Sequence, residues 1–307
     1  MKGTFELWSA VRLTAWSEAH LLRVEAALSD WVGVRAPVLL GDAMRYAVLD
    51  GGKRLRPLLV LATAEAVDGH SDAALRAACA AELIHAYSLV HDDLPCMDND
   101  VLRRGKPTVH VKFGEADALL AGDALQALAF ELLTPDEGDH GIPPGMQAQL
   151  CRLLARAAGS NGMAGGQAID LASVGQTLDE PRLREMHRMK TGALLQGSVE
   201  MGAACAETPL APAGLVALRA YGAALGLAFQ VVDDILDVTA DSATLGKTAG
   251  KDAASDKPTY VSLLGLEGAR AEARLLLAHA LDALGRSGLA DTSAMHALAR
   301  MVVERDS

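Results

Sequence analysis

Apolar residues recur at the spacing of an α-helix along most of the 307-residue chain, and no stretch alternates apolar and polar residues as a half-buried strand would. Polar or Pro/Gly-rich stretches at 134–145, 207–214 and 240–257 separate the apolar segments, and none is a linker long enough to divide domains. We therefore predict an all-α protein, with a single helical domain over residues 1–307. The expected helices cover 5–31, 38–50, 55–67, 72–93, 115–133, 146–160, 179–205, 212–238, 258–285 and 291–304.

The composition agrees with a globular helical protein and narrows its partners. Hydrophobic residues make up 50% of the chain and charged residues 22%, which suits a sizeable core and excludes a disordered chain. The net charge of −11 argues against nucleic acid or an anionic membrane as a partner. The longest apolar run, 220–232, is too short to span a membrane, and the four scattered cysteines have no disulfide or metal-site spacing. The first twenty residues lack the apolar core of a signal peptide. We expect a cytoplasmic protein with no membrane span.

The segment "HDDLPCMDND" at 91–100 concentrates acids where an apolar helix ends. Asp92 and Asp93 lie 100° apart on that helix and flank one edge of it. Pro95 biases the residue before it out of helical geometry, so we expect Asp98 to return from an irregular turn. An acidic doublet alone is typical of a solvated helix end.

A second segment, "FQVVDDILD" at 229–237, repeats the pattern on another apolar helix. Asp233 and Asp237 are four residues apart and share one face, with Gln230 one turn before them. Their neighbours are large and apolar, so these carboxylates are costly to bury unless they are paired or bind a metal. If the two helices face each other, they form a cleft lined by carboxylates.

The ligand types favour Mg²⁺. Carboxylate oxygens without Cys or His partners suit this ion, which takes one or two carboxylates together with waters and substrate phosphates. A di-iron bundle is the competing interpretation, because Glu82 and His85 match half of its Glu-x-x-His signature. The only other match to that signature, Glu137 with His140, lies in the Pro/Gly-rich stretch 134–145 rather than on an apolar helix, which disfavours di-iron.

Basic residues accompany these acids in several short segments. "GGKRLRP" (51–57) begins a helix with three cations, an arginine doublet follows the first acid segment, and "RMKTGALL" (188–195) has small residues that allow close backbone approach. Each segment alone is typical of a solvated surface. Together with the carboxylates, they predict a cleft that binds metal ions and more than one phosphate-bearing ligand. The cations are Lys53, Arg54, Arg56, Arg103, Arg104, Lys190, Lys247, Lys251 and Lys257.

Six segments follow one another in the order of a known enzyme family: "GGKRLRP", "HDDLPCMD" with "LRRGKPT", "GMAGGQAIDL", "KTGALL", "FQVVDDILD", and a final "GK" and "KPTY". Over residues 51–260 the chain therefore resembles the trans-isoprenyl diphosphate synthases, most closely the bacterial farnesyl diphosphate synthases. The resemblance implies the isoprenoid synthase fold, which is a single helical bundle around a central cavity, and a homodimer. It also implies isopentenyl diphosphate and allylic diphosphates as substrates.

The same resemblance implies roles for individual residues. The aspartates would bind Mg²⁺, three ions per active site, some of them only together with diphosphate. Basic groups would hold the two diphosphates, and Thr191 and Gln230 would lie near the developing cation. The implied magnesium ligands are Asp92, Asp93, Asp98, Asp233, Asp234 and Asp237. The implied contacts of the allylic diphosphate are Arg103, Lys190, Lys247 and Lys257, and those of isopentenyl diphosphate are Lys53, Arg56, His85 and Arg104. The expected catalytic residues are Asp92, Asp93, Lys190, Thr191, Gln230 and Asp233.

The chemistry of the family explains these residue types. The allylic C–O bond ionises, and cations placed on the leaving diphosphate stabilise the transition state more than the ground state. The double bond of isopentenyl diphosphate attacks the resulting carbocation, and the proton that is lost goes to the released pyrophosphate. No nucleophilic side chain is needed, and no Ser/His or Cys/His pair stands out in the sequence.

Product length would be set by Tyr87 and Ser88, because in this family the growing chain extends down the cavity from the first aspartate segment. Tyr87 lies five residues before Asp92, about 7.5 Å along a helix axis, so its ring would close the cavity after fifteen carbons. We expect (2E,6E)-farnesyl diphosphate as the product. Geranylgeranyl diphosphate is the alternative, because "PCMDND" also resembles synthases that make it.

Two further functions remain as rivals. A class I terpene cyclase shares the metal-binding carboxylates and the helical fold, but it needs no second diphosphate pocket and commonly lines its cavity with aromatic rings, which are only 4% of this chain. A non-catalytic scaffold subunit of a prenyl synthase usually loses one aspartate segment, whereas this chain has both. Both rivals are therefore disfavoured.

Overall fold

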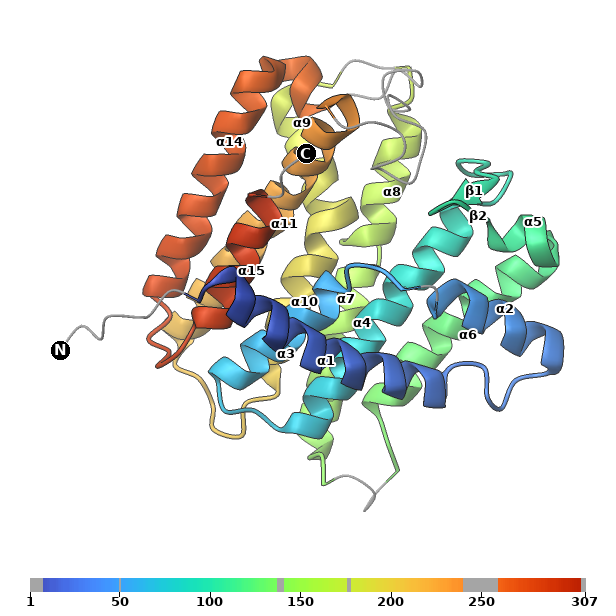
Figure 1. The fold of residues 1–307 in the computed structure, drawn as a ribbon, viewed down its shortest axis with the longest axis horizontal. Helices are drawn as coiled ribbons and strands as arrows, with labels where there is room; N and C mark the ends of the chain where they lie inside the picture. The colour runs from blue at the N-terminus through green and yellow to red at the C-terminus, as the bar shows by residue number, and fades with distance from the viewer. Residues whose placement is uncertain (1–7, 50, 137–140, 176–177, 240–258, 305–307) are drawn as a thin grey trace.

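The computed structural model describes residues 8–49, 51–136, 141–175, 178–239 and 259–304. Within these ranges the chain is almost entirely helical (Figure 1), and a short antiparallel hairpin, β1 (Leu102–Arg103) with β2 (Lys106–Pro107), follows α4. The prediction of an all-α fold is confirmed. The helices are α1 (Ala10–Trp31), α2 (Val38–Val48), α3 (Leu55–Ala66), α4 (Ser71–Asp92), α5 (Val109–Phe113), α6 (Glu115–Leu133), α7 (Pro144–Ala158), α8 (Met163–Ala172), α9 (Glu180–His187), the π-helix η1 (Arg188–Gly192), α10 (Ala193–Ala204), α11 (Pro212–Thr239), α14 (Tyr260–Gly285) and α15 (Ser293–Val303).

The structure departs from the predicted helices in two places that matter for the site. The helix expected at 179–205 is interrupted, because α9 passes into η1 before α10 begins. Helix α8 forms in a glycine-rich segment where the sequence predicts no helix, although each glycine disfavours a helix by about 1 kcal/mol relative to alanine. Packing against neighbouring helices outweighs that local preference.

The helices pack as a series with α4 near its middle. Helix α4 contacts α6 and α3, α3 contacts α10, α10 contacts α11, and α11 contacts α14. Figure 1 shows α2, α5 and α6 on one side of the bundle and α14 on the opposite side. Buried alanines on α4, such as Ala73, Ala77, Ala80 and Ala81, leave room for neighbours on more than one face of the helix.

The two helices that carry the aspartates, α4 and α11, are long and apolar enough to cross a membrane by length and composition alone. However, 78% and 56% of their most apolar windows are buried inside the protein. Core helices of globular proteins have the same character, so these two helices are a weak indication of a membrane span.

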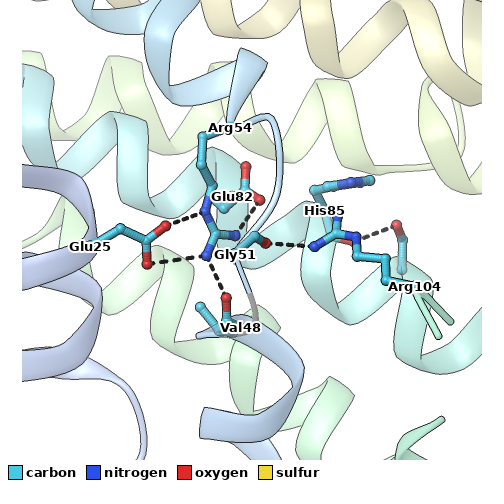
Figure 2. A network of polar contacts seen from close by, with 8 residues as sticks. Glu25, Val48, Gly51, Arg54, Glu82, His85 and Arg104 are labelled. Carbon is cyan, nitrogen blue, oxygen red and sulfur yellow. Dashed lines mark hydrogen bonds and ion pairs between the residues drawn. The ribbon is translucent and has the colours of Figure 1, made fainter. Parts of the chain in front are cut away.

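The turn before α3 is held by Arg54, which is 4% exposed and has a φ of +44°. Its guanidinium donates to Glu25 on α1 at 2.7 Å, to Glu82 on α4 at 2.7 Å, and to the carbonyl of Val48 at the end of α2 at 2.6 Å (Figure 2). A single buried side chain therefore joins four helices. The left-handed backbone at Arg54 directs its side chain into this network.

The same turn receives Arg104 from the hairpin that follows α4. Arg104 Nη1 donates to the carbonyl of Gly51 at 2.5 Å, close to His85 (Figure 2). The guanidinium also lies against Gly52, whose φ is +136°, and a Cβ at Gly52 would be 2.9 Å from Arg104 Nη1. The backbone conformation therefore requires glycine at position 52, and a larger residue there would also displace the end of the Arg104 side chain.

We predict that Arg54→Met destabilises the protein by about 3 kcal/mol or more, because it leaves the carboxylate of Glu82, which is 3% exposed, buried without its cation. The double variant Arg54→Met, Glu82→Met should recover much of that loss, because it removes both charges. Urea unfolding followed by circular dichroism measures both effects. Arg270→Met, which removes an exposed ion pair with Glu267, is the matched control and should change stability by less than about 0.5 kcal/mol. An Arg54→Met variant as stable as this control would contradict the prediction.

Candidate active site

A cavity of about 380 Å³ lies between α4, α8 and η1, with one side chain contributed by α3. This volume is within the range of small-molecule sites, about 300–1,000 Å³. Its lining combines the charged groups Arg56, Asp92 and Lys190 with an apolar wall that includes Met163 and Leu171. Such a lining suits a ligand with an anionic head and a hydrocarbon tail.

Asp92 is the last residue of α4, and Asp98 returns beside it. After the helix ends, the N–H of Asp98 donates to the carbonyl of Asp92 at 2.8 Å, which confirms the turn predicted from Pro95. Burial, opposed by Lys190 and reinforced by Asp98, raises the pKa of Asp92 to about 6. Carboxylates at the C-terminal end of a helix also face the negative end of its dipole. The pair is therefore held in a place that a cation would stabilise.

Asp93 is occupied by a protein partner. It is 2% exposed, and Arg103 Nη2 and Nε donate to its two carboxylate oxygens at 2.7 and 2.9 Å. This bidentate pair ties the hairpin to the end of α4. Asp93 stays a predicted ligand of the metal, and Arg103 a predicted contact of the diphosphate. Each is already bound to the other, so a metal on Asp93 or a diphosphate on Arg103 would share that residue with the ion pair.

The second aspartate segment is connected to η1 by a chain of hydrogen bonds. Thr191 Oγ1 donates to Gln230 Oε1 at 2.9 Å, and Gln230 Nε2 donates to Asp234 Oδ1 at 3.0 Å. Asp234 Oδ2 then accepts from the backbone N–H of Tyr260, at the start of α14, at 2.7 Å. Asp234 is 2% exposed and satisfies a helix N-terminus, so it holds η1, α11 and α14 in fixed relation.

Asp233 and Asp237 lie one turn apart on α11, as the spacing predicts. Asp233 is half-buried and Asp237 is 4% exposed. The charge of Asp233 acts on Arg56, which lines the cavity from α3, so the second aspartate segment lies close to the cavity.

Lys190 is positioned by α8. Its Nζ donates to Asp170 Oδ2 at 2.5 Å, and Asp170 is itself buried. The two elements touch closely, since a Cβ at Gly166 would be 2.1 Å from the backbone nitrogen of Lys190. The π-helix thus places Lys190 and Thr191, two consecutive residues, in the lining of one cavity.

Two half-buried basic side chains contribute to the site from α3 and α4. Burial lowers the pKa of Arg56 from its ordinary value, against the attraction of Glu82 and Asp233, but an arginine stays charged. Its Nε has no hydrogen-bond partner among the described residues. Burial, together with Arg56 and Arg104, lowers the pKa of His85 well below its usual range, so this imidazole is neutral. Arg56 is therefore a half-buried cation whose buried Nε is an unused donor.

A second pocket adjoins the cavity along α4, because His85 and Leu89 line both. It is lined by Asp93, Arg103 and Arg104. Each predicted diphosphate set is split between the two pockets. Of the allylic set, Lys190 lines the cavity and Arg103 the second pocket; of the isopentenyl set, Arg56 lines the cavity, Arg104 the second pocket, and His85 both.

The carboxylates fit magnesium better than a transition metal. Within the described ranges no three His, Cys, Asp or Glu side chains are already gathered around one point. The carboxylate oxygens of the two aspartate segments suit Mg²⁺, which completes its coordination with waters and substrate phosphates. A di-iron centre does not fit, because the carboxylate of Glu82 is bound to Arg54 and His85 lies among arginines.

Most of the predicted site residues lie in or beside these two pockets, but the sequence did not single out all that matter. Lys53 is exposed in the turn before α3, and Ser88 lines the cavity. Lys247 and Lys257 lie outside the described residues. Asp170 and Gln167 were missed, although two polar side chains in the glycine-rich segment "GMAGGQAIDL" were a signal that could have identified them.

A family model described as polyprenyl synthetase matches residues 37–294. The chain belongs to the polyprenyl synthetase family. Its fold, the two aspartate segments and the adjoining basic pockets are accounted for by membership of this family.

Curated members of the polyprenyl synthetase family resemble the chain over most of its length. The probable farnesyl diphosphate synthase of Sinorhizobium fredii strain NGR234 is 51% identical over 279 residues, covering 89% of this chain and 82% of the relative. The farnesyl diphosphate synthase of Escherichia coli K12 is 46% identical over 300 residues, covering 94% of this chain and 97% of the relative. Other relatives are named geranylgeranyl pyrophosphate synthases.

Solved structures of the family share the fold. The apo structure of an FPP/GFPP synthase from Zymomonas mobilis has a TM-score of 0.84 and 42% identity, covering 96% of this chain and 100% of the other. A geranyltransferase from Helicobacter pylori, complexed with magnesium and isoprenyl diphosphate, has a TM-score of 0.83 and 34% identity, covering 97% and 99%.

Proposed function

We propose that the chain condenses isopentenyl diphosphate with dimethylallyl and then geranyl diphosphate, releasing pyrophosphate at each step and giving (2E,6E)-farnesyl diphosphate. The observation that carries the proposal is one cavity in which Asp92, Lys190 and Thr191 share the lining with an apolar wall and Tyr87. The farnesyl diphosphate synthases among its relatives, at 46–51% identity over most of the chain, support the same reaction.

Ionisation of the allylic substrate is the step that the charged groups serve. The C–O bond breaks, and its electron pair leaves with the diphosphate. Lys190, oriented by Asp170, places a positive charge beside the leaving group where negative charge accumulates. Mg²⁺, when bound by the aspartates, supplies Lewis-acid stabilisation of that charge. We propose Asp92 and Asp98 on one side and Asp233 and Asp237 on the other as its main ligands, with three ions per site as in the family.

The carbocation left behind is served by neutral dipoles. The hydroxyl hydrogen of Thr191 is committed to Gln230, so the oxygen lone pairs of Thr191 remain as the partially negative group in the cavity lining. Because Asp234 fixes the amide of Gln230, neither dipole needs to reorient as the positive charge develops. These groups stabilise a cation without offering a nucleophile strong enough to capture it.

Isopentenyl diphosphate fits the basic groups near the turn before α3. Arg56 is half-buried, with an unused donor at its buried Nε, and Arg104 lies against Gly51 and Gly52 beside the neutral His85. Lys53 completes the proposed set. Holding the second substrate there places its double bond in the cavity, so the attack occurs within one bound complex. The bond forms to the allylic carbon, and the proton lost from the adduct goes to pyrophosphate.

Product length is proposed to depend on Tyr87, whose ring is 8% exposed and lines the cavity. The ring packs edge-on against His91 at 5.7 Å, and His91 Nε2 lies 3.0 Å from the carbonyl oxygen of Leu119 on α6. A Cβ at Gly122 would collide with His91. His91, which lines the same cavity, thus connects Tyr87 to α6, and this contact supports the proposed role of Tyr87 as the floor of a cavity for a fifteen-carbon chain.

The location and assembly belong to the same proposal. All four cysteines are free thiols, which supports a reducing cytoplasm. A homodimer is supported by large apolar side chains exposed on α5 and α6, two elements that contact each other, namely Val111, Leu119 and Leu120 at 49%, 48% and 54% exposure.

The reaction is tested by incubating the purified chain with isopentenyl and dimethylallyl diphosphates. We expect linear farnesyl diphosphate with Mg²⁺ and no product after chelation. Asp92→Asn and Asp233→Asn should each lower kcat by about 100-fold or more, because they weaken charge stabilisation at the leaving group. Asp30→Asn, at the exposed end of α1, is the control and should retain full activity. Cyclic hydrocarbon would indicate a terpene cyclase, and no turnover would indicate a scaffold subunit.

Tyr87→Ala should lengthen the product from fifteen toward twenty carbons, because it removes the ring that closes the cavity. Chromatography of the dephosphorylated products measures the shift. Tyr221→Phe, which removes a buried hydroxyl far from the cavity lining, is the matched control and should still give fifteen carbons. An unchanged product from a folded Tyr87→Ala variant counts against this role.

Sedimentation of the purified chain should give the mass of two copies at micromolar concentration. Leu119→Lys with Leu120→Lys should shift the equilibrium to one copy, since it places charge on the proposed contact face. Val216→Lys, on an exposed part of α11, is the control and should leave the mass unchanged. A wild-type chain that sediments as one copy would refute the homodimer.

A further inference from the structure

Helix α8 contributes one face to the cavity, and that face contains a single amide. Met163, Ala164, Gln167, Ala168 and Leu171 line the cavity at the spacing of one helical face. Four of the five are apolar. Gln167 is therefore the polar group in a wall that otherwise suits a hydrocarbon, and its presence there requires a reason.

Neither polar atom of Gln167 makes a hydrogen bond. Both Nε2 and Oε1 are buried, and neither has a partner within the described ranges. Buried amides without partners are rare, because they lose their hydration and gain nothing in return. A leucine at this position would line the same wall without that loss.

The position of Gln167 is fixed while its amide is not. Helix α8 is held against η1 by the contact of Gly166 with the backbone of Lys190 and by the bond between Asp170 and Lys190. Gln167 lies between these two residues on α8, so its Cα keeps a constant place relative to Lys190. Because its amide has no hydrogen bond to break, the side chain can turn toward a ligand without losing one.

We propose that Gln167 is a further substrate-contact residue, whose amide N–H group donates to the diphosphate of the allylic substrate beside Lys190. The inference rests on the proposed function, because it requires an allylic diphosphate in this cavity. A diphosphate offers only acceptor oxygens, so the amide nitrogen is the atom that it can engage. A neutral donor suits the place, since a cation at this position of α8 would compete with Lys190 for Asp170.

A structural role for Gln167 makes opposite predictions. If the amide held the fold together, replacing it would lower stability. If it waits for substrate, Gln167→Leu removes an unsatisfied polar group and leaves thermal stability unchanged or raises the midpoint by about 2 °C. The same variant should lower kcat/KM for geranyl diphosphate about 10-fold, which is typical of a lost hydrogen bond to a charged group.

Gln167→Glu tests the direction of the hydrogen bond. It keeps the shape of the side chain but replaces the donor by an anionic acceptor, so we expect a loss of about 100-fold in kcat/KM, larger than that of Gln167→Leu. The KM for isopentenyl diphosphate should stay within about twofold of wild type in both variants. Gln147→Leu is the matched control: Gln147 donates to the carbonyl of Ile142 outside the cavity, so its loss should leave kinetics unchanged.

Affinity is measured separately from turnover, by calorimetric titration of geranyl diphosphate with Mg²⁺ and without isopentenyl diphosphate. Weaker binding in the order wild type, Gln167→Leu, Gln167→Glu supports the proposal. Three outcomes would each overturn it. The Gln167→Leu variant could keep wild-type affinity and kcat/KM, its thermal midpoint could fall by more than about 5 °C, or Gln167→Glu could bind geranyl diphosphate more tightly than Gln167→Leu. If the wild-type chain makes no prenyl product, but the affinity for geranyl diphosphate still falls from wild type to Gln167→Leu to Gln167→Glu, the proposed function is refuted and this inference stands.

Discussion

Negative charge confined at the C-terminal ends of two apolar helices is the constraint on which the rest of this structure depends. Asp92, the last residue of α4, is placed where burial, neighbouring carboxylates and the helix dipole oppose ionisation, and Asp233 lies half-buried among apolar neighbours on α11. Protein groups stabilise two of the neighbouring carboxylates. Arg103 pairs with Asp93, and Asp234 accepts hydrogen bonds from Gln230 and from the N-terminus of α14. Asp92 and Asp233 are among the carboxylates that the proposed function assigns to metal binding.

Two arginines at the start of α3 have different environments although they are the same residue type. Arg54 and Arg56 are two residues apart, yet Arg54 is fully engaged by Glu25, Glu82 and Val48, whereas Arg56 reaches the cavity with a donor unused. The left-handed backbone at Arg54 separates their directions. Arg54 therefore holds the turn in place, while the Nε of Arg56 keeps an unused donor at the cavity.

The parts that could be predicted from the sequence are those determined by local pattern. The period of apolar residues located α4 and α11, the four-residue spacing aligned Asp233 with Asp237, and Pro95 predicted the return of Asp98. The parts that could not are determined by tertiary contact. Helix α8 forms despite its glycines, because Gly166 allows close packing against the backbone of η1. Nothing in the local sequence distinguishes the buried Arg54 from Arg56 at the cavity. The assignment of metal ligands among the six aspartates likewise depends on which of them find protein partners.

The interruption between α9 and α10 has a consequence for the architecture of the bundle. A regular helix presents its faces at a constant phase, so a straight rod from 179 to 205 would keep every residue in step with the one before it. The wider turn of η1 resets that phase. Both halves contact α11, but α9 also lies against α8 and α14, whereas α10 also lies against α3, α4 and α7. One continuous segment of chain thereby joins two parts of the bundle, and Lys190 and Thr191, which line the cavity, lie at the point where the phase changes.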